Sequence, residues 1–164
     1  MAKLYVAYGS NLNMRQMRGR CPGSVFVGTG EIQNYELQFK GSLYGAHATI
    51  AHKDGASVPV AVWKIQRRDE QSLDYYEGYH KTGYRYYDKE QISVKMADGS
   101  RIKGMVYIMD PKQDFGNPAK SYYDTVRQGY LDCGLDTTVL DRAVEESMDL
   151  AQVRMMARGE MEFV

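Results

Sequence analysis

The sequence contains few of the residues that build metal centres and disulfide frameworks. Its two cysteines, Cys21 and Cys133, lie far apart and form no CxxC pair, so they indicate neither a disulfide framework nor a zinc site. The three histidines, His47, His52 and His80, have no spacing that would group them on one helix face, and no HExxH motif is present. We therefore expect these side chains to lie at the surface or in the packed core, and we expect no metal ion.

Net charge and long apolar segments are also absent. The 164 residues carry 21 Lys and Arg against 21 Asp and Glu, which gives no electrostatic reason to expect nucleic acid or an anionic membrane as the main partner. No charged-then-apolar leader and no long apolar run is found. The sequence therefore predicts a cytoplasmic protein that binds neither nucleic acid nor membrane. The zero net charge does not exclude a local basic patch, such as one formed by Arg15, Arg18 and Arg20.

Two motifs of nucleophilic and phosphate chemistry are missing around Ser10. No GxSxG turn surrounds this serine, and the Gly-Lys-Ser/Thr ending of a phosphate-binding P-loop is absent. We therefore interpret Ser10 as a turn or ligand-contact residue, and nucleotide hydrolysis is disfavoured.

The N-terminal segment instead offers an apolar strand, residues 3–8, that breaks abruptly at Gly9. Glycine lets the backbone turn tightly and approach a ligand closely, and Ser10 and Asn11 can cap a helix expected at residues 14–18. Backbone N–H groups left unpaired at such a turn suit an anion or a developing oxyanion. An ordinary strand–turn–helix joint without a ligand is the alternative that spacing alone leaves open.

The rest of the chain is mostly strands with a few helices. Strands are expected at residues 25–30, 35–40, 48–51, 58–66, 84–95 and 101–109, with turns at Asp54-Gly55 and Asp98-Gly99. Helices are expected at residues 70–77, 119–133 and 138–157, the first with Asp69 as N-cap and Gly78 as its end, the second ended by Gly134.

This order of elements predicts the fold class. Because hairpins rather than regular crossover helices join the strands, we expect an α+β fold with a mixed, largely antiparallel, barrel-like sheet and flanking helices. No internal repeat or linker is present, so residues 1–164 are expected to form one domain.

Glu77 is the carboxylate of greatest chemical interest. It follows Leu73 by four residues on the expected helix, so the two share a face, and Leu73 indicates that this face is buried. Burial among tyrosines, of which the chain has 14, would raise the pKa of Glu77 and suit a general acid/base near neutral pH. A solvated Glu at a helix end is the alternative, and Asp74 is the weaker candidate.

Four segments carry a resemblance to a known family. They are Tyr8-Gly9-Ser10-Asn11-Leu12; Ala48-Thr49-Ile50 with Val60-Ala61-Val62-Trp63-Lys64; Leu73-Asp74-Tyr75-Tyr76-Glu77-Gly78 with Tyr84 and Arg85; and Pro118-Ala119-Lys120-Ser121-Tyr122 leading to Gly129 and Gly134-Leu135. In this order, and over about residues 3–136, they resemble the gamma-glutamylcyclotransferase (AIG2-like) family. The pairing of the first loop with the Glu-Gly helix end is the more specific part of the match.

The resemblance implies the same barrel-like α+β fold and an enzyme of acyltransferase or lyase type. Its reaction releases 5-oxoproline from a γ-glutamyl amino acid, peptide or amine, because the substrate's α-amine attacks its own γ-carbonyl, and it requires neither a metal nor an organic cofactor. The family's catalytic acid/base matches Glu77. The residues implied in substrate binding are Tyr122 and the loop formed by Tyr8, Gly9, Ser10, Asn11 and Leu12.

Departures from the family pattern leave the leaving amine undetermined. The run Gly83-Tyr84-Arg85-Tyr86 differs in detail, and the helix after Thr137 lies outside the matched region. The leaving group is expected to contact the variable loops at residues 41–45 and 114–118. The resemblance implies a small-molecule γ-glutamyl partner and leaves a homodimer open. Two alternatives also stay open: a non-catalytic module that binds a small molecule or partner protein on this fold, and hydrolysis that releases glutamate.

Overall fold

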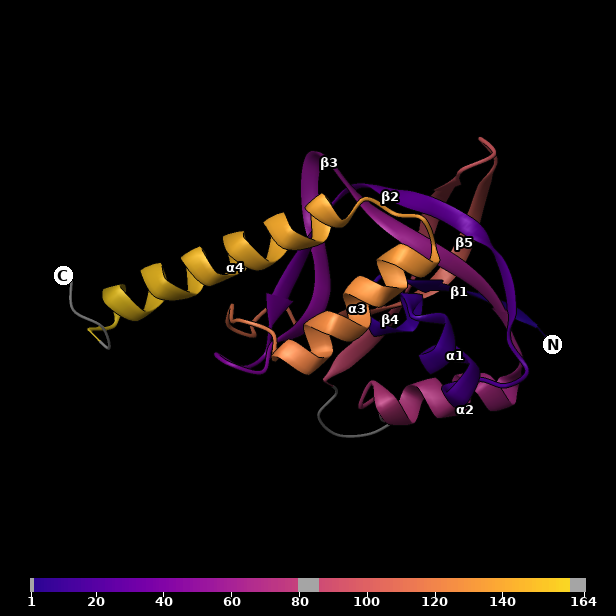
Figure 1. The fold of residues 1–164 in the computed structure, drawn as a ribbon, viewed down its shortest axis with the longest axis horizontal. Coiled ribbons are helices and arrows are strands. Elements are labelled where there is room, and N and C mark those ends of the chain that lie inside the picture. The colour runs from indigo at the N-terminus through magenta and orange to yellow at the C-terminus, as the bar shows by residue number, and fades with distance from the viewer. Residues whose placement is uncertain (1, 80–85, 160–164) are drawn as a thin grey trace.

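A closed barrel of five strands organises the described part of the chain, residues 2–79 and 86–159 of the computed structural model (Figure 1). The strand order is β1-β3-β2-β4-β5, and only the β1–β5 pairing is parallel. The strands are β1 (Lys3–Ala7), β2 (Val25–Lys40), β3 (His47–Ile65), β4 (Tyr87–Met96) and β5 (Arg101–Met109). The α+β class with a mixed, largely antiparallel barrel is therefore confirmed.

Helices surround the barrel and connect its strands. A short 3-10 turn, η1 (Ser10–Leu12), follows β1 and leads into α1 (Met14–Arg20). The others are α2 (Arg67–Tyr76), α3 (Lys120–Asp132) and α4 (Thr137–Ala157). In Figure 1, α1 and α2 lie together below the barrel, α3 crosses in front of it, and α4 projects away from it toward the C-terminus.

Two predicted interruptions in the sheet are wrong, because strands β2 and β3 run continuously through them. The expected break between residues 30 and 35 is a bulge at Asn34, whose φ is 63°. The Asp54-Gly55 turn is absorbed opposite that bulge: Gly55 has a φ of 84°, and its N–H donates to Asn34 Oδ1 at 3.0 Å. Irregular backbone on both partners lets the pairing resume, so a turn signal produced a bulge rather than a strand end.

Helix boundaries differ from the prediction mainly in their caps. Asn13, not Ser10 or Asn11, caps α1, because its side chain accepts from Gln16 N at 3.0 Å. Helix α2 begins at Arg67, and Asp69 acts from the third helical position as half of a capping box, its carboxylate accepting from Gln66 N at 2.9 Å.

The predicted ends of elements agree better with the structure. Gly78 and Gly134 follow α2 and α3 with φ of 62° and 65°, and Gly99 has a φ of 88° in the β4–β5 hairpin. The predicted start of a strand at residue 84 lies outside the described residues, as do Tyr84 and Arg85.

Strand β1 is buried on both faces, which explains its unbroken apolar sequence. Tyr5 and Ala7 pack with the α1 and α2 side of the sheet, where Met17 and Leu73 lie, whereas Val6 belongs to the second core cluster. A strand covered on both faces reads as a continuous apolar run rather than an alternating one. The loop that follows β1 is consequently held by a strand whose last three residues are buried.

Helix α3 lies directly against that loop at Gly129. A Cβ at Gly129 would lie 2.5 Å from Asn13 N and 2.6 Å from the carbonyl carbon of Leu12. Two further contacts fix the same packing: Asn13 Nδ2 donates to Thr125 O at 3.1 Å, and Met14 N donates to Asp132 Oδ2 at 3.0 Å. The loop is therefore pressed between β1 and α3.

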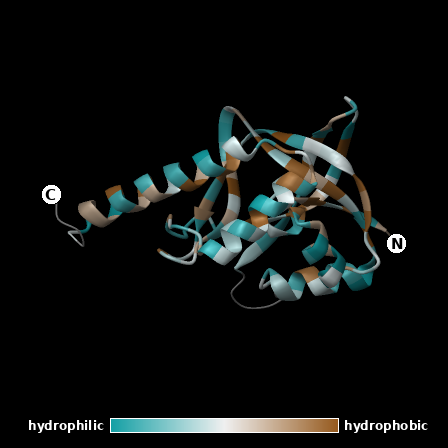
Figure 2. Ribbon diagram, viewed as in Figure 1, coloured by the Kyte–Doolittle hydropathy of each residue, from teal (hydrophilic) through white to brown (hydrophobic). Residues whose placement is uncertain are grey.

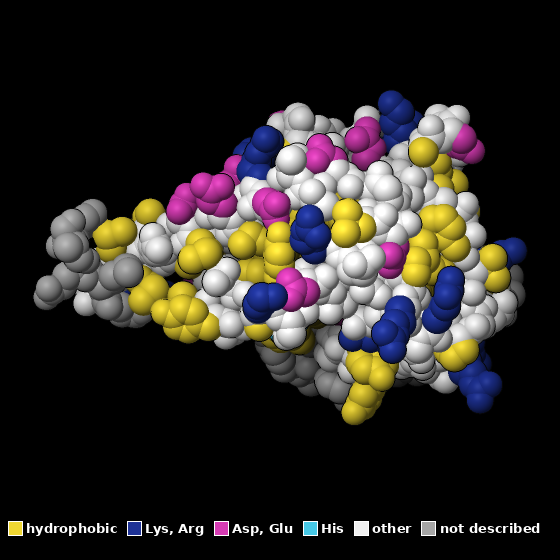
Figure 3. All heavy atoms as spheres, viewed as in Figure 1, with side chains coloured by type: hydrophobic (Ala, Val, Ile, Leu, Met, Phe, Trp, Pro, Cys, Tyr) yellow, Lys and Arg dark blue, Asp and Glu magenta, His cyan; other side chains and the backbone are white. Residues whose placement is uncertain are grey.

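Helix α4 packs on the core through its first turns and on β2 near its middle. Leu140 and Ala143 are buried in the core, and Ser147 Oγ accepts from Phe39 N in β2 at 3.0 Å. Hydrophobic colouring continues beyond this contact along α4 (Figure 2), and apolar side chains are visible on its outer part (Figure 3). Leu150 and Val153 there are 43% and 58% exposed.

Gly129→Ala should destabilise the protein although alanine favours helix. The added methyl group meets backbone atoms of Leu12 and Asn13, which cannot rotate away, so we expect a loss of about 1–3 kcal/mol in the free energy of unfolding. Gly19→Ala is the matched control, because no atom beyond its chain neighbours and the backbone of its own helix lies within 4 Å of its Cβ position, and the change should add up to about 1 kcal/mol. Urea denaturation of both variants measures this. Equal stability of the two would show that α3 does not depend on close approach to the loop.

Candidate active site

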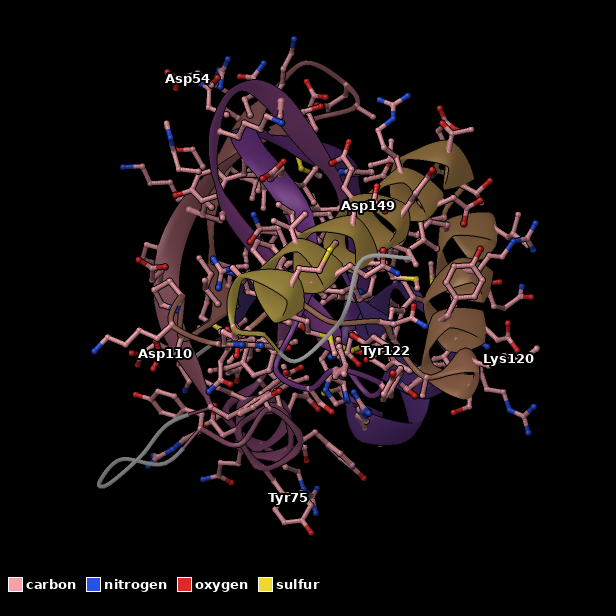
Figure 4. All side chains as sticks on the ribbon, turned by 90° about the vertical axis from the view of Figure 1, so that its left-hand side faces the viewer. Asp54, Tyr75, Asp110, Lys120, Tyr122 and Asp149 are labelled. Carbon is pink, nitrogen blue, oxygen red and sulfur yellow. The ribbon has the colours of Figure 1, made fainter. Side chains whose placement is uncertain are left out.

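A cavity of about 180 Å³ opens where β1 ends and the loop to η1 begins. Its lining residues come from β1, this loop, α1, the first residues of β3, the end of α2, β4, β5 and α3. In the side view of Figure 4, Tyr122 lies in the interior, whereas Tyr75 and Lys120 point outward. Of the site residues predicted from the sequence, six line this cavity: Tyr8, Gly9, Ser10, Asn11, Glu77 and Tyr122.

Glu77 projects into the cavity from the C-terminal end of α2. Its own N–H is bonded to Leu73 O at 2.8 Å, which fixes the backbone there, and Gly78 then turns the chain away. No hydrogen bond to the Glu77 carboxylate forms among the described residues. Burial raises the pKa of Glu77 from about 4.5 to about 7, and the positive charge of Arg20 acts in the opposite direction. The carboxyl group is therefore divided between its two protonation states near neutral pH.

The preceding carboxylates on the same face of α2 are paired, unlike Glu77. Lys89 of β4 lies 2.8 Å from Glu70 and 2.8 Å from Asp74, and Lys3 of β1 lies 2.7 Å from Glu70. Asp74 also accepts from the Tyr107 hydroxyl at 2.6 Å. Asp74, the weaker acid/base candidate, is thus part of the contacts that attach α2 to the barrel.

The loop after β1 lines the cavity with residues whose backbone N–H groups have no protein acceptor among the described residues. Among the described residues, the N–H groups of Gly9, Ser10 and Asn11 donate to no protein acceptor. Gly9 is tightly enclosed: a Cβ there would lie 3.3 Å from the Tyr122 hydroxyl oxygen and 3.3 Å from Ala48 Cβ. Leu12 differs from the other predicted loop residues, because its N–H donates to Gly9 O at 3.1 Å and its side chain is fully buried in the core, away from the cavity.

Arg20 holds the side chains of this loop. Its Nη1 donates to Asn11 Oδ1 at 3.0 Å and to Ser10 Oγ at 3.3 Å, and Asn11 Nδ2 donates to the Tyr5 hydroxyl at 2.9 Å. The guanidinium carbon lies 4.3 Å from the centre of the Tyr76 ring. Asn11 is therefore a buried amide with both ends bonded to protein, and the contact it can offer a ligand is its backbone N–H.

Tyrosine hydroxyls that stay neutral line the cavity next to this loop. The peptide group of Ala48 joins two of them: its N–H donates to the Tyr122 hydroxyl oxygen at 3.1 Å, and its carbonyl accepts from the Tyr87 hydroxyl at 2.7 Å. Burial raises the pKa of both hydroxyls well above the usual value near 10, so both stay protonated. Because the Tyr122 oxygen already accepts a hydrogen bond, its own hydrogen is available to a ligand.

Several lining residues were not singled out by the sequence. Arg20 was noted only as part of a basic patch, and its position at the last turn of α1 gives no sign that it faces a cavity. His47, expected at the surface or in the core, lines the cavity edge-on to Tyr122, with ring centres 4.7 Å apart. Burial lowers the pKa of His47. The many tyrosines were the available signal, but only folding brings Tyr87 and Tyr107 to this place.

The variable loops at residues 41–45 and 114–118 are not among the residues that line the cavity, and their contact with the leaving group stays a prediction. Residues 41–45 and 114–118 pack against each other: Asn117 N donates to Leu43 O at 2.8 Å, and a Cβ at Gly116 would lie 1.9 Å from Ser42 O. Arg154 of α4 pairs with Asp114 at 3.3 Å. The two loops therefore serve the attachment of α4.

The described residues contain neither a metal-binding cluster nor a helix suited to crossing a membrane. No group of three or more His, Cys, Asp or Glu in residues 2–79 and 86–159 is arranged to hold a metal ion. Within the same residues, no helix combines the length and apolar character needed to cross a membrane.

An unpaired carboxyl of raised pKa beside a loop with free N–H groups, in a tyrosine-lined cavity, is the kind of site that performs acid–base chemistry on a small molecule. The family model described as "Gamma-glutamyl cyclotransferase, AIG2-like" matches residues 5–126. The chain belongs to this family.

Individual relatives agree with the family match. Gamma-glutamylcyclotransferase of Mus musculus is 31% identical over 139 residues, covering 80% of this chain and 72% of that protein, and the Homo sapiens protein of the same name is 30% identical over the same shares. A solved structure named gamma-glutamyl cyclotransferase superposes with a TM-score of 0.77 at 27% identity, covering 87% of this chain and 86% of that one. YkqA from Bacillus subtilis has a TM-score of 0.71 at 17% identity, covering 90% of this chain and 54% of that one, a likeness of fold.

Ionisation of the Glu77 carboxyl should lower the free energy of unfolding, because the folded protein shields this group from solvent. Its pKa is near 4.5 in the unfolded chain and about 7 in the fold, so the folded state loses stability as pH rises through this interval, and the loss is complete above pH 7. Glu77→Gln removes the ionisation. We expect the variant to gain on the order of 2 kcal/mol relative to wild type between pH 4 and pH 8, measured by urea unfolding at both values. A difference between the two proteins that does not change with pH would contradict the raised pKa.

Proposed function

We propose that this protein is a gamma-glutamylcyclotransferase that releases 5-oxoproline from a γ-glutamyl compound, with Glu77 as general acid/base. The observation that carries the proposal is the Glu77 carboxyl, which faces the cavity without a protein partner among the described residues and has a pKa of about 7. A group with a pKa near the working pH can both accept and donate a proton efficiently.

In the first half of the reaction, the substrate's α-amine becomes the nucleophile. The lone pair of the neutral amine attacks the γ-carbonyl carbon of the same molecule, and as this bond forms the Glu77 carboxylate takes a proton from the attacking nitrogen. A carbon–nitrogen bond forms, the five-membered ring closes, and the carbonyl electron pair moves onto oxygen. Because nucleophile and electrophile belong to one molecule, a cavity that folds the glutamyl chain supplies much of the acceleration.

The developing oxyanion requires hydrogen-bond donors that are already in place. The free N–H groups of Gly9, Ser10 and Asn11 are suited to this role, because the loop is fixed from behind by α3 and need not reorganise. The Tyr122 hydroxyl, with its oxygen held by Ala48 N–H, is suited to donate to a substrate oxygen. Tyr8 contributes a buried wall, since its own hydroxyl donates to Tyr107 O at 2.6 Å.

In the second half, the intermediate collapses and expels the amine. The oxyanion electron pair re-forms the carbonyl, the bond to the leaving nitrogen breaks, and protonated Glu77 returns its proton to that nitrogen. Glu77 thereby ends in its starting state, so the proposed cycle requires no external acid or base.

Glu77→Gln should abolish turnover while leaving the fold intact. Glutamine fills the same space but cannot accept the amine proton, so we expect kcat/KM to fall by about 100- to 10,000-fold. The assay is mass spectrometry of products from a panel of γ-glutamyl amino acids, γ-glutamyl amines and glutathione. Glu146→Gln, on the exposed side of α4, is the control and should retain wild-type turnover.

The products separate the competing functions. Release of 5-oxoproline identifies attack by the internal amine, and release of free glutamate identifies attack by water. Saturable binding of γ-glutamyl compounds with neither product would overturn the proposal in favour of a binding module, and full activity of Glu77→Gln would remove Glu77 from the mechanism.

The pH dependence of the wild type should report the same group. Glu77 must be ionised to accept the proton, so kcat/KM should decline by about tenfold per pH unit below pH 7 and level off above it. Initial rates at subsaturating substrate from pH 5 to pH 8 measure this limb. A limb with its midpoint near pH 4.5 would show that Glu77 behaves as an ordinary exposed carboxylate.

A further inference from the structure

The cavity contains two opposite charges that do not meet. Arg20 and Glu77 both line it, and the positive charge of Arg20 acts on Glu77, yet no ion pair joins these two side chains in residues 2–79 and 86–159. Because the two charged side chains line one cavity and do not pair with each other, a ligand with both a positive and a negative charge could bind between them. Such a ligand would place its cation by Glu77 and its anion by Arg20.

The guanidinium group of Arg20 has donors to spare. The hydrogen bonds to Ser10 Oγ and Asn11 Oδ1 both use Nη1. Arginine carries further N–H donors on Nη2 and Nε, arranged in a planar fork that fits a carboxylate. The contacts to the loop and to the Tyr76 ring fix the plane of this fork, so little side-chain freedom remains to be lost on binding.

The γ-glutamyl group carries a matching pair of charges on one carbon atom. Its α-ammonium and α-carboxylate are separated only by Cα, and the amine must reach Glu77 for the proposed reaction to begin. The carboxylate is bonded to the same carbon, so it must also lie close to Glu77. A cationic side chain that lines the cavity is the partner that would stabilise it there. Among the described lining residues Arg20 is the permanently charged cation; His47 also lines the cavity, but burial lowers its pKa.

We propose that Arg20 binds the α-carboxylate of the γ-glutamyl substrate, so that the zwitterionic end of the substrate bridges Arg20 and Glu77. This inference rests on the proposed function and adds a recognition residue to it. It limits the substrates to γ-glutamyl compounds with a free α-carboxylate, whatever amine they carry. It also turns the α-amine toward Glu77, since the two groups share one carbon.

The experiment compares two substrates that differ only in the carboxylate. One is the γ-glutamyl amide of a chosen amine, and the other is the 4-aminobutanoyl amide of the same amine, which closes to a lactam with the same ring size. Amine release from both is measured with wild type, Arg20→Gln and Arg20→Lys. Arg18→Gln is the control, because Arg18 is an exposed arginine on the same helix.

The decisive quantity is the ratio of kcat/KM for the two amides. Any effect of Arg20 on the loop or on the pKa of Glu77 acts on both substrates and cancels in this ratio. We expect the ratio to fall by about 10- to 100-fold in Arg20→Gln, the loss typical of a charged hydrogen bond. The loss should be smaller in Arg20→Lys and absent in Arg18→Gln.

Other outcomes would overturn the assignment. An equal loss for both amides would make Arg20 a support of the loop alone. A loss confined to γ-glutamyl amides whose amine carries its own carboxylate would place Arg20 at the leaving group.

A binding measurement tests the role of Arg20 independently of whether the proposed reaction occurs. If wild type forms no lactam from any γ-glutamyl compound, calorimetric titration with L-glutamine and with 4-aminobutanamide still compares ligands that differ only in the carboxylate. Preference for L-glutamine that is lost in Arg20→Gln would support the inference without turnover. No preference in wild type would refute it.

Discussion

The site depends on one carboxyl group, that of Glu77 at the end of α2, which is shielded from solvent without an ion-pair partner among the described residues. Three acidic residues follow one face of this helix, and Lys3 and Lys89 neutralise the first two, Glu70 and Asp74. These pairs attach α2 to β1 and β4 and thereby hold Glu77 over the cavity. Because Glu77 has no such partner among the described residues, burial raises its pKa instead of being offset by an ion pair.

The opposite wall depends on close backbone packing. Gly129 allows α3 to touch the backbone of Leu12 and Asn13, and β1 holds the other side of the loop through a strand buried on both faces. A loop fixed in this way can keep N–H groups at the edge of a cavity without protein acceptors among the described residues. The packed loop and the Glu77 carboxyl therefore line one cavity, and each is positioned by contacts outside that cavity.

Much of the fold was predictable because its signals are local. The glycines at 78, 99 and 134 ended elements as expected, since a positive φ is a property of the residue itself. The interruptions expected in β2 and β3 were wrong because the partner strand, and not the local sequence, decides whether Asp54-Gly55 becomes a turn or part of a bulge. The packing of the loops at 41–45 and 114–118 on each other and on α4 was not visible in the sequence for a related reason, because it joins segments far apart in the chain.

By itself, the sequence determined the kind of protein: the α+β class, the family, and the order of the loop, the Glu-Gly helix end and Tyr122. Those properties follow from residues that are neighbours in the chain. Only the tertiary structure decided which groups face one another. Arg20, Glu77 and Tyr122 come from three different helices or helix ends. The pKa of Glu77 is raised because the surrounding elements exclude solvent from its carboxyl group. The Leu73–Glu77 spacing indicated which face of the helix is buried, but the position of Arg20 opposite that carboxyl depends on how separate elements pack around the cavity.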